Sequence, residues 1–467
     1  MVAMTIGGES VAGETEFGVI DPASEETFAS APDCSARQLD EAMRAAQRAF
    51  GQWRRDIAAR RIALVHAAEI VQAHGEELAQ LITREQGKPL AKARREVAGT
   101  AAWIRYTAKL EIPCEIAQDD EQIRVEVRRR PCGVVAAITP WNYPLISAAW
   151  KFAPALLAGN TMVLKPSPFT PLATLRLGEL LLEALPPGVL NVVSGGDALG
   201  KRMTSHPSVR KISFTGSIEA GKHVAASAAP DLKRVTLELG GNDAAIVFED
   251  VDVKAAAQKL FWGAFENSGQ VCIAIKRLYV QERIFGALLE ELTRIAKNTK
   301  VGPGCNVDTE LGPLNNRPQF ERVQELCDDA RRVGGRVTAG GARVGARGYF
   351  FEPTIVTGLA DDARLVAEEQ FGPILPCLPF ASADEALARA NATHFGLAGS
   401  VWSADRRRAE AVAGEMDCGT VWINQHLSVL PSAPVGGHKW SGIGVENGSW
   451  GLLGFTEIQT VEIPKVW

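Results

Sequence analysis

The stretch Gly133-Val-Val-Ala-Ala-Ile138 opens the part of the chain that decides the fold. It is a short apolar run with the length of a buried strand, and similar runs follow at 161–165, 189–193, 210–214 and 234–239. Helical sequence separates these runs; Thr170-Pro171, for example, caps a leucine-rich helix between the second run and the third. Strands and helices that alternate in this way predict a doubly wound parallel sheet, an architecture typical of nucleotide binding.

A second series of strands and helices begins at Ala244-Ala-Ile-Val-Phe248. We expect helices before Cys272, near 283–297 and near 318–333, and strands near 353–357, 374–380 and 419–423. Residues 36–110, upstream of both series, keep the apolar spacing of helices. Ser35 and Gln38 form a capping box there, and Gly87 before Pro89 closes a later helix. The chain therefore carries a helical entry segment and two α/β units.

Two pieces fit neither unit, namely the alternating runs Gln122–Arg128 and Thr456–Trp467. Alternation of apolar and polar side chains indicates strands with one exposed face. We expect both to be exposed strands with open edges, which usually need a partner. A chain of 467 residues also exceeds what one hydrophobic core supports, so we expect two large domains with small additions.

Charge and composition favour small-molecule chemistry. The net charge is −5, the isoelectric point is near 5.9, and Lys and Arg are interspersed with Asp and Glu, so no nucleic-acid partner is expected. No apolar run approaches the ~18 residues needed to span a bilayer, and Met1–Gly18 lacks the pattern of a signal peptide. We expect a cytoplasmic protein without a membrane segment, in which the sequon at Asn391 is coincidental.

The eight cysteines are spread singly, without a CxxC pair or the Cys and His spacing of a zinc site. We therefore expect reduced thiols and no metal. One of them, Cys272, follows the turn residues Gly269 and Gln270 in the run from Phe265 to Arg277. A glycine turn lets a sulfur and its own backbone N–H face a substrate together, and a thiolate attacks carbonyl carbon readily. The alternative is a small thiol packed as a hydrophobe.

Two further polar groups stand at turns. The run Leu237-Glu238-Leu239-Gly240-Gly241 delivers a carboxylate that is either a general base or a solvated charge. Asn142 stands between Pro140 and Pro144, where its amide is either a rigid oxyanion donor or a turn former. Each motif, taken singly, leaves both interpretations open.

Taken in order, the motifs resemble the NAD(P)-dependent aldehyde dehydrogenase superfamily from about residue 15 to the C-terminus. The resemblance implies that Cys272 is the nucleophile, Glu238 the general base and Asn142 the oxyanion donor. It implies oxidation of an aldehyde to the carboxylic acid with NAD(P), through a thiohemiacetal and then a thioester that water hydrolyses. The motifs are Pro140-Trp-Asn-Tyr-Pro144, Lys165-Pro-Ser167, Phe214-Thr-Gly-Ser217, Leu237-Glu-Leu-Gly-Gly241, Gly269-Gln-Val-Cys272, Glu369-Gln-Phe-Gly-Pro373 and Gly436-Gly-His-Lys-Trp-Ser-Gly442.

The resemblance also divides the chain. The expected fold class is α/β, with a Rossmann-like cofactor domain, an α/β catalytic domain and a small β oligomerisation element. The dinucleotide-binding domain is expected at 1–118 and 133–240, and the catalytic domain at 241–440. Because strands such as 119–132 and 453–467 bridge subunits in the resembling family, a homodimer or homotetramer is expected.

The cofactor site is less obvious from the residues alone. No GxGxxG follows a strand, so the standard dinucleotide fingerprint is missing. Gly216 and Ser217 instead stand at a strand-to-helix turn, which either meets a pyrophosphate or is plain architecture. In the family likeness Lys165 serves the adenine ribose and Glu369 the nicotinamide ribose. The cofactor-binding candidates are Trp141, Lys165, Ser167, Pro168, Gly195, Phe214, Gly216, Ser217, Gly240, Glu369 and Phe371.

Pro168 bears on which cofactor is used. NAD-specific members of the resembling family commonly carry a glutamate three residues after the strand-ending lysine, and this chain has Pro168 there. Proline neither accepts a hydrogen bond from the ribose nor repels a 2′-phosphate, whereas Lys165 can pair with that phosphate. We expect both NAD and NADP to support turnover, with a modest lean to NAD.

The motif alignment also gives a substrate pocket, mostly apolar with one polar tip, that favours a medium-sized aromatic or aliphatic aldehyde. Its residues are Tyr143, Trp150, Val271, Ile273, His426 and Val435. Relatives that oxidise succinic semialdehyde tend to have an arginine where Trp150 stands, so a semialdehyde dehydrogenase is the alternative, with a cation reaching in from a loop. An acylating enzyme that passes the thioester to coenzyme A or phosphate is also compatible with the fold, as is a redox-inactive scaffold protein.

Overall fold

The larger sheet contains the five parallel strands that the sequence predicts. The computed structural model describes residues 2–466. The five strands lie side by side in the order β11, β10, β7, β8, β9. Their bounds are β7 Val134–Ile138, β8 Thr161–Lys165, β9 Leu190–Val192, β10 Val209–Thr215 and β11 Arg234–Glu238. Three short antiparallel strands, which the sequence did not indicate, extend the sheet: β1 Met4–Ile6, β2 Glu9–Val11 and β19 Gly442–Ile443.

Helices pack against this sheet, and their buried apolar side chains form one hydrophobic core with those of its strands. The capping box of Ser35 and Gln38 is present at the start of α1, and Gly87 ends α3 in the left-handed conformation at φ 97°. The entry helices are α1 Ala36–Trp53, α2 Ile57–Ala73, α3 Gly75–Gln86 and α4 Leu90–Ala108. The connecting helices are α5 Pro144–Ala158, α6 Leu172–Leu180, α7 Asp197–Ser205 and α8 Ile218–Ala228.

The second sheet follows the order β14, β15, β16, β13, β12, β17, β18, and β14 alone runs antiparallel to its neighbour. The sequence missed its central strand β13, because Lys276 and Arg277 interrupt the apolar pattern there although both are buried. The bounds are β12 Asp243–Val247, β13 Ile275–Gln281, β14 Arg336–Ala339, β15 Thr354–Thr357, β16 Ile374–Phe380, β17 Ala398–Trp402 and β18 Thr420–Ile423. The helices are α9 Val253–Phe265, α10 Glu282–Asn298, α11 Arg317–Arg332, α12 Arg364–Ala367, α13 Ala383–Asn391 and α14 Arg406–Gly414.

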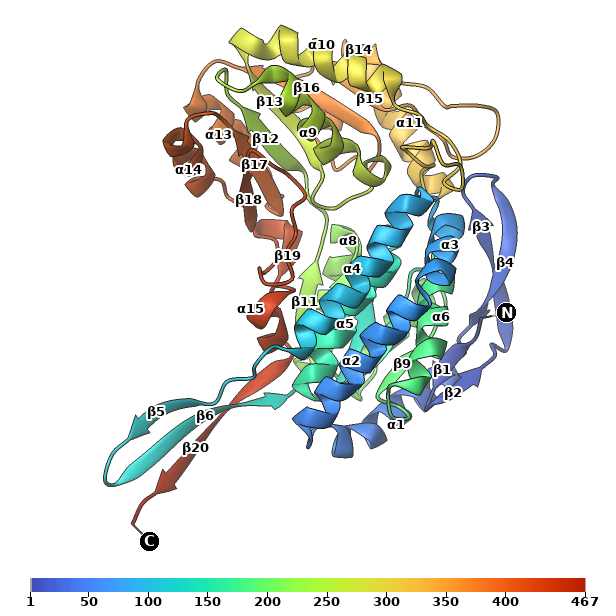
Figure 1. Ribbon diagram of the computed structural model, residues 1–467, viewed down its shortest axis with the longest axis vertical. Helices are drawn as coiled ribbons and strands as arrows, with labels where there is room; N and C mark the ends of the chain where they lie inside the picture. Colours follow the sequence, from blue (N-terminus) through green and yellow to red (C-terminus); the bar gives the residue numbers. More distant parts are fainter. Residues whose placement is uncertain (1, 467) are drawn as a thin grey trace.

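A three-stranded arm projects from the larger body (Figure 1). Its strands are β5 Glu115–Asp119, β6 Ile123–Pro131 and β20 Thr456–Pro464, and α15 Gly448–Leu453 precedes β20. The expectation that both alternating runs have open edges was wrong for the first run, because β6 lies between β5 and β20 and pairs with both. Trp467, the last residue of the second run, lies outside the described residues. The arm leaves its open edges on β5 and β20.

The remaining ribbon consists of β3 Thr15–Asp21 and β4 Glu26–Asp33, paired antiparallel. Within residues 2–466, no helix combines the length and the apolar character needed to cross a membrane.

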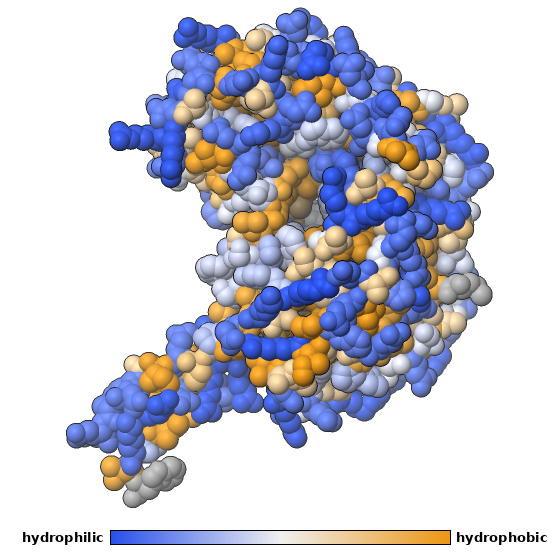
Figure 2. All heavy atoms as spheres, viewed as in Figure 1, coloured by the Kyte–Doolittle hydropathy of each residue, from blue (hydrophilic) through white to orange (hydrophobic). Residues whose placement is uncertain are grey.

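The two sheets face each other across a hollow that Figure 2 shows on this side of the molecule. Because β7, β8, β10 and β11 are parallel, the loops that follow them gather at one edge of the larger sheet. Those loops begin at Thr139, Pro166, Gly216 and Leu239. The second sheet contributes the segment between α9 and β13, which contains Cys272. Residues from both sheets therefore meet between them.

Candidate active site

The turn before Cys272 is held in an unusual backbone conformation. Asn267, Ser268 and Gly269 all have positive φ, at 51°, 57° and 74°. The left-handed region costs a residue with a side chain roughly 1–2 kcal/mol, so surrounding contacts must maintain this turn. Gly269 is required for a second reason, since a Cβ at this position would lie 2.2 Å from the backbone oxygen of Gly372.

Hydrogen bonds supply those contacts. The Ser268 hydroxyl donates to the Gly312 carbonyl at 2.7 Å, and the Asn267 side chain donates to the Asn142 carbonyl at 3.1 Å. The Gln270 side chain donates to the Asn267 carbonyl at 2.9 Å and accepts from the backbone N–H of Asn315 at 2.8 Å. The turn is therefore fixed before a substrate arrives.

Two N–H donors, one on Cys272 itself and one on the side chain of Asn142 that contacts the turn before it, have unused capacity. The Asn142 amide is buried and donates to the backbone oxygen of Gln270 at 2.8 Å; throughout the described chain its second hydrogen has no further acceptor. The backbone N–H of Cys272 likewise has no acceptor among residues 2–466. N–H donors that are held in place and have no acceptor can stabilise a negative oxygen that develops next to the sulfur.

Glu238 ends β11 in a buried position with 3% of its surface exposed. Its Oε1 has no hydrogen-bond partner in the part of the chain that the structure describes. Burial raises the pKa of this carboxyl well above its usual range, and the nearby Glu446 raises it further. The Lys151 ammonium, which lies 2.5 Å from Glu446 Oε1, acts in the opposite direction. An unpaired buried carboxyl of this kind can accept a proton from water.

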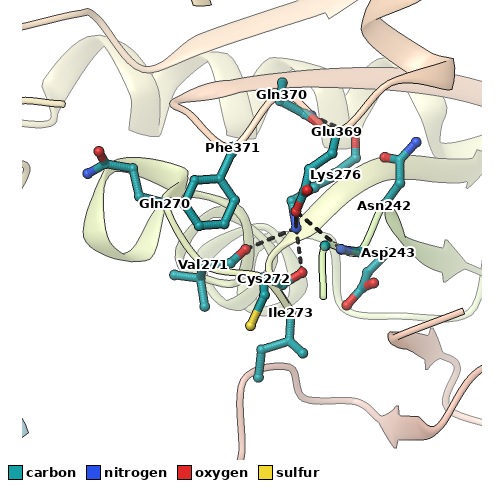
Figure 3. A network of polar contacts seen from close by, with 12 residues as sticks. Asn242, Asp243, Gln270, Val271, Cys272, Ile273, Lys276, Glu369, Gln370 and Phe371 are labelled. Carbon is teal, nitrogen blue, oxygen red and sulfur yellow. Dashed lines mark hydrogen bonds and ion pairs between the residues drawn. The ribbon is translucent and has the colours of Figure 1, made fainter. Parts of the chain in front are cut away.

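The Cys272 thiol is also shifted away from its charged form. Burial raises its pKa, and the charge of Glu238 is the next largest cause. Lys276 lowers the pKa of the same thiol. The Lys276 ammonium donates to the backbone oxygens of Val271 and Cys272 and lies 3.2 Å from Glu369 Oε1 (Figure 3). No motif in the sequence marked Lys276 as part of the site.

Glu369 is joined to Cys272 by this network and fits closely against a glycine. Its carboxylate accepts from the backbone N–H of Gly241 at 3.2 Å. A Cβ on Gly240 would lie 2.1 Å from Glu369 Oε2, so only glycine leaves room for the carboxylate in this position. Phe371 lies two residues further on, with a ring centroid 5.2 Å from that of Trp141. These candidates for the nicotinamide end of a cofactor are thus grouped together.

Lys165 is a buried ammonium without a close acidic partner. It is 3% exposed, and its only hydrogen bond within the described chain is to the Pro166 carbonyl at 3.1 Å. Burial lowers its pKa to about 8, which the distant charges of Asp197 and Asp33 only partly offset. A buried ammonium with spare donors fits ribose hydroxyls or a phosphate.

The other cofactor candidates lie at the same sheet edge. The Ser167 hydroxyl accepts from the Phe169 N–H at 3.3 Å, and the half-buried Pro168 lies between these residues. Gly195 immediately precedes the N-cap of α7. Phe214 lies beneath the Gly216 turn, with ring atoms 2.5 Å from where a Gly216 Cβ would be. The Ser217 side chain caps α8 by accepting from the Ala220 N–H, so its oxygen already has a structural function.

An apolar cluster surrounds the thiol. Val271 and Ile273 are buried on either side of Cys272, and Tyr143 packs in the same cluster. Leu427 and Val429 also belong to it. They lie in an irregular loop after β18, and no local pattern in the sequence marks such a loop as pocket lining.

The expectation for His426 was wrong in one respect. Its ring nitrogens contact Ser400 Oγ at 2.9 Å and the Ile273 carbonyl at 2.7 Å, and burial lowers its pKa to about 3. His426 therefore stabilises the loops as a neutral ring and leaves no free polar tip for a substrate.

Trp150 and Val435 are not members of the apolar cluster around the thiol. Trp150 is seven residues after Tyr143 on the same face of α5, and its ring centroid is 6.0 Å from that of Trp103. Val435 forms an isolated bridge with Glu446, which supports the loop beside Glu238. The structure therefore links Val435 more directly to the Glu238 side of the site than to Cys272.

Charged residues line the outer end of this region. A hollow of about 530 Å³ adjoins His426 and Leu427. Lys92 pairs with Glu266 at 2.8 Å on its rim. Arg95 also lines the hollow, is exposed, and makes no ion pair in the described part of the chain. Across the described residues, no group of three or more His, Cys, Asp or Glu side chains is arranged to hold a metal ion.

Known proteins are similar to this chain in sequence and in fold. The model of the aldehyde dehydrogenase family matches residues 9–461. The chain belongs to the aldehyde dehydrogenase family. The predicted resemblance is thereby confirmed, as is the α/β fold class.

Individual relatives cover nearly the whole chain. It is 39% identical to human retinaldehyde dehydrogenase 3, over 97% of this chain and 91% of the relative. It is 38% identical to phenylacetaldehyde dehydrogenase from Pseudomonas fluorescens, over 98% of this chain and 95% of the relative. A solved NAD+ complex of an aldehyde dehydrogenase from Bacillus cereus is 37% identical, with a TM-score of 0.97, covering 99% of this chain and 96% of that one.

We predict that the buried charge of Lys165 costs this aldehyde dehydrogenase stability. Its pKa is about 8 in the folded protein against an ordinary 10.5, so the cost is fully present below pH 8 and is lost as the pH rises towards 10.5. Lys165→Met should raise stability at pH 7 by at most about 3 kcal/mol, and this gain should shrink by pH 10. Thermal unfolding at pH 7, 8.5 and 10 measures it, with the exposed Lys201→Met as the control. A gain that does not change with pH contradicts the prediction.

Proposed function

We propose that this aldehyde dehydrogenase oxidises an aldehyde to the carboxylic acid through a thioester on Cys272, with NAD as the cofactor. The observation that supports it most strongly is that the Cys272 backbone N–H and the Asn142 amide, which contacts the turn before Cys272, both have unused donor capacity. An unpaired buried carboxyl, Glu238, accompanies them. Nucleophile, oxyanion donors and base are the groups that acyl chemistry requires.

In the first step the Cys272 thiolate adds to the aldehyde carbon, and the carbonyl oxygen becomes an oxyanion. The Cys272 N–H and the Asn142 amide bind this oxyanion. Both donors are fixed before the reaction, because the turn is held by its own hydrogen bonds and Asn142 by Gln270. Little reorganisation is then needed when charge develops.

The cofactor residues fit a nicotinamide dinucleotide. The unpaired ammonium of Lys165 suits the adenine ribose, and Glu369 suits the nicotinamide ribose because Gly240 leaves it space. Trp141 and Phe371 would line the nicotinamide pocket, and Gly195 and Gly216 would lie near the pyrophosphate. When bound, the nicotinamide would supply the acceptor for the hydride that the thiohemiacetal carbon on Cys272 loses as its oxyanion collapses to the thioester carbonyl. Support comes from the Bacillus cereus relative, whose structure is an NAD+ complex.

Glu238 completes the cycle by removing a proton from water, which attacks the thioester and releases the carboxylic acid and the thiol. Its raised pKa means that its basic form increases as the pH rises. Deacylation should therefore be faster in mildly alkaline solution than at neutral pH.

Substitutions of the two central residues test this mechanism. Cys272→Ala should abolish aldehyde oxidation, because no other group forms the thioester, while cofactor binding persists. Glu238→Gln should retain a burst of reduced nicotinamide and then turn over slowly, because only deacylation loses its base. Stopped-flow absorbance of the reduced cofactor measures both, with Cys305→Ala, an exposed thiol, as the control. Residual turnover in Cys272→Ala, or unchanged turnover without a burst in Glu238→Gln, would refute the mechanism.

We propose that the substrate is a medium-sized aromatic or aliphatic aldehyde, because the residues around the thiol are apolar. The phenylacetaldehyde and retinaldehyde dehydrogenases among the relatives agree with this class. The exposed Arg95 at the outer hollow favours the second candidate, a semialdehyde whose carboxylate reaches that guanidinium.

The substrate proposal predicts a higher kcat/KM for benzaldehyde or straight-chain aldehydes than for succinic semialdehyde. Arg95→Ala should change this ranking little, since the apolar cluster makes the main contacts. Steady-state rates with and without coenzyme A measure the ranking and also detect an acylating enzyme. A preference for succinic semialdehyde that Arg95→Ala removes would support the semialdehyde alternative instead. A folded protein with no oxidation of any aldehyde would support a scaffold role.

We also propose that NADP supports turnover, with a modest lean to NAD. Pro168, which follows the end of β8 at Lys165, carries no charge to repel a 2′-phosphate. Pro168→Glu should therefore weaken NADP much more than NAD. The ratio of kcat/KM for the two cofactors in both proteins measures this. An unchanged ratio would place Pro168 away from the ribose.

We propose a cofactor domain at 1–118 and 133–240, a catalytic domain at 241–440, and an arm that joins subunits of a homodimer or homotetramer. The open edges of β5 and β20 and exposed apolar side chains such as Ile116 and Ile458 support the assembly. We also propose a cytoplasmic location, which agrees with the singly spread cysteines.

A further inference from the structure

Lys276 lies directly behind the nucleophile, and the mechanism above gives it no function. It is the second residue of β13, and its side chain is 2% exposed. Its Nζ donates to the Val271 oxygen at 2.9 Å and the Cys272 oxygen at 2.5 Å, and lies 3.2 Å from Glu369 Oε1 (Figure 3). An ammonium has three hydrogens, so these partners satisfy it completely in one orientation.

The contact with Val271 determines where an oxyanion donor points. The Val271 carbonyl and the Cys272 N–H belong to one peptide unit, and in a trans peptide they point in opposite directions. Because the Lys276 ammonium holds the carbonyl on one side, the N–H must face the other side. The Cys272 sulfur also points away from the ammonium (Figure 3). The positive charge of the Lys276 ammonium also polarises this peptide unit, and this polarisation makes the Cys272 N–H a stronger hydrogen-bond donor.

Lys276 also supplies positive charge where carboxyl groups predominate. Burial is the largest cause of the raised pKa of the thiol. The charges of Glu238, Glu369 and Asp243 raise this pKa further, and that of Lys276 lowers it. The titratable and charged groups that face Cys272 come from four strands or their loops and from the start of α5: Glu238, Asp243, Lys276, Glu369 and Tyr143.

We propose that Lys276 is a positioning residue for Cys272, which aims the Cys272 N–H at the developing oxyanion and stabilises the thiolate. The oxyanion half of this proposal rests on the proposed function, whereas the thiolate half does not. Through Glu369 the same ammonium joins the nucleophile to the carboxylate that is proposed to hold the nicotinamide ribose.

The pH dependence of Cys272 alkylation by iodoacetamide, followed by mass spectrometry of the peptide that contains it, tests the thiolate half without any aldehyde. Lys276→Met should raise the apparent pKa of this thiol by about one unit or more, because a nearby cation is lost. Glu369→Gln should lower it, because a nearby anion is lost. The exposed Cys305 in the same samples is an internal reference whose profile should not move.

Two controls separate charge from damage to the fold. Lys276→Arg keeps the charge and should keep the thiol profile near that of the wild type. Lys211→Met removes another buried strand lysine, whose Nζ donates to Thr236 Oγ1, and should leave the Cys272 profile unchanged. If Lys276→Met leaves the profile of a folded protein unchanged, or if Lys276→Met and Glu369→Gln shift it in the same direction, the proposed charge effect is wrong.

The first turnover tests the oxyanion half. The rate of the burst of reduced nicotinamide, divided by the rate of Cys272 alkylation at the same pH to correct for the thiolate population, should be at least roughly tenfold lower in Lys276→Met than in wild type. An equal corrected burst rate would overturn the positioning of the N–H. A wild-type protein without a burst would instead refute the proposed function, and the alkylation profiles would still decide whether Lys276 stabilises the thiolate.

Discussion

Exclusion of water from the ionisable groups around Cys272 is the constraint on which the site depends. Burial raises the pKa values of Cys272, Glu238 and Glu369, so each group is less charged than it would be in water. Burial lowers the pKa of Lys165 for the same reason. A site of this kind disfavours charge on its nucleophile and base, and the positive charge of Lys276 offsets part of that cost for the Cys272 thiolate.

The second requirement is that groups from two sheets stay in register. Asn142 follows β7 of the larger sheet and Cys272 precedes β13 of the second sheet, and the Asn142 amide bonds the Gln270 carbonyl directly. The buried Lys88 supports this loop by donating to the Asn142 carbonyl at 2.8 Å and to Glu96 at 2.6 Å. Oxyanion donors and nucleophile are therefore fixed relative to one another by polar contacts that water does not reach.

Much of this architecture could be predicted from the sequence, because apolar runs of strand length alternate with helical segments. The five parallel strands and the Ser35 capping box follow directly from local patterns. The strand β13 does not, since its buried Lys276 and Arg277 have the composition of a surface segment. Only their partners, the carbonyls around Cys272 and Asn242, explain their burial.

The residues of the candidate site also fall into those that local sequence patterns mark and those that they do not. Cys272, Glu238 and Asn142 stand in recognisable turns, so the residue types and their order are informative. Leu427, Val429 and Lys276 reach the site through tertiary contacts, which local sequence does not encode. His426 was selected for its polar ring, yet the Ile273 carbonyl and Ser400 occupy both nitrogens. Polarity in a sequence does not reveal whether the group is already satisfied within the fold.

The thioester on Cys272 is the central claim, and direct detection of the acyl group tests it best. The Glu238→Gln protein is mixed with a radiolabelled or isotopically heavy aldehyde and NAD, quenched in acid during the burst, and digested for mass spectrometry. We predict one acyl group per active site, on the peptide that contains Cys272, in the same amount as the reduced cofactor formed. Reduced cofactor without an acylated Cys272 peptide, or an acyl group on another cysteine, would contradict it.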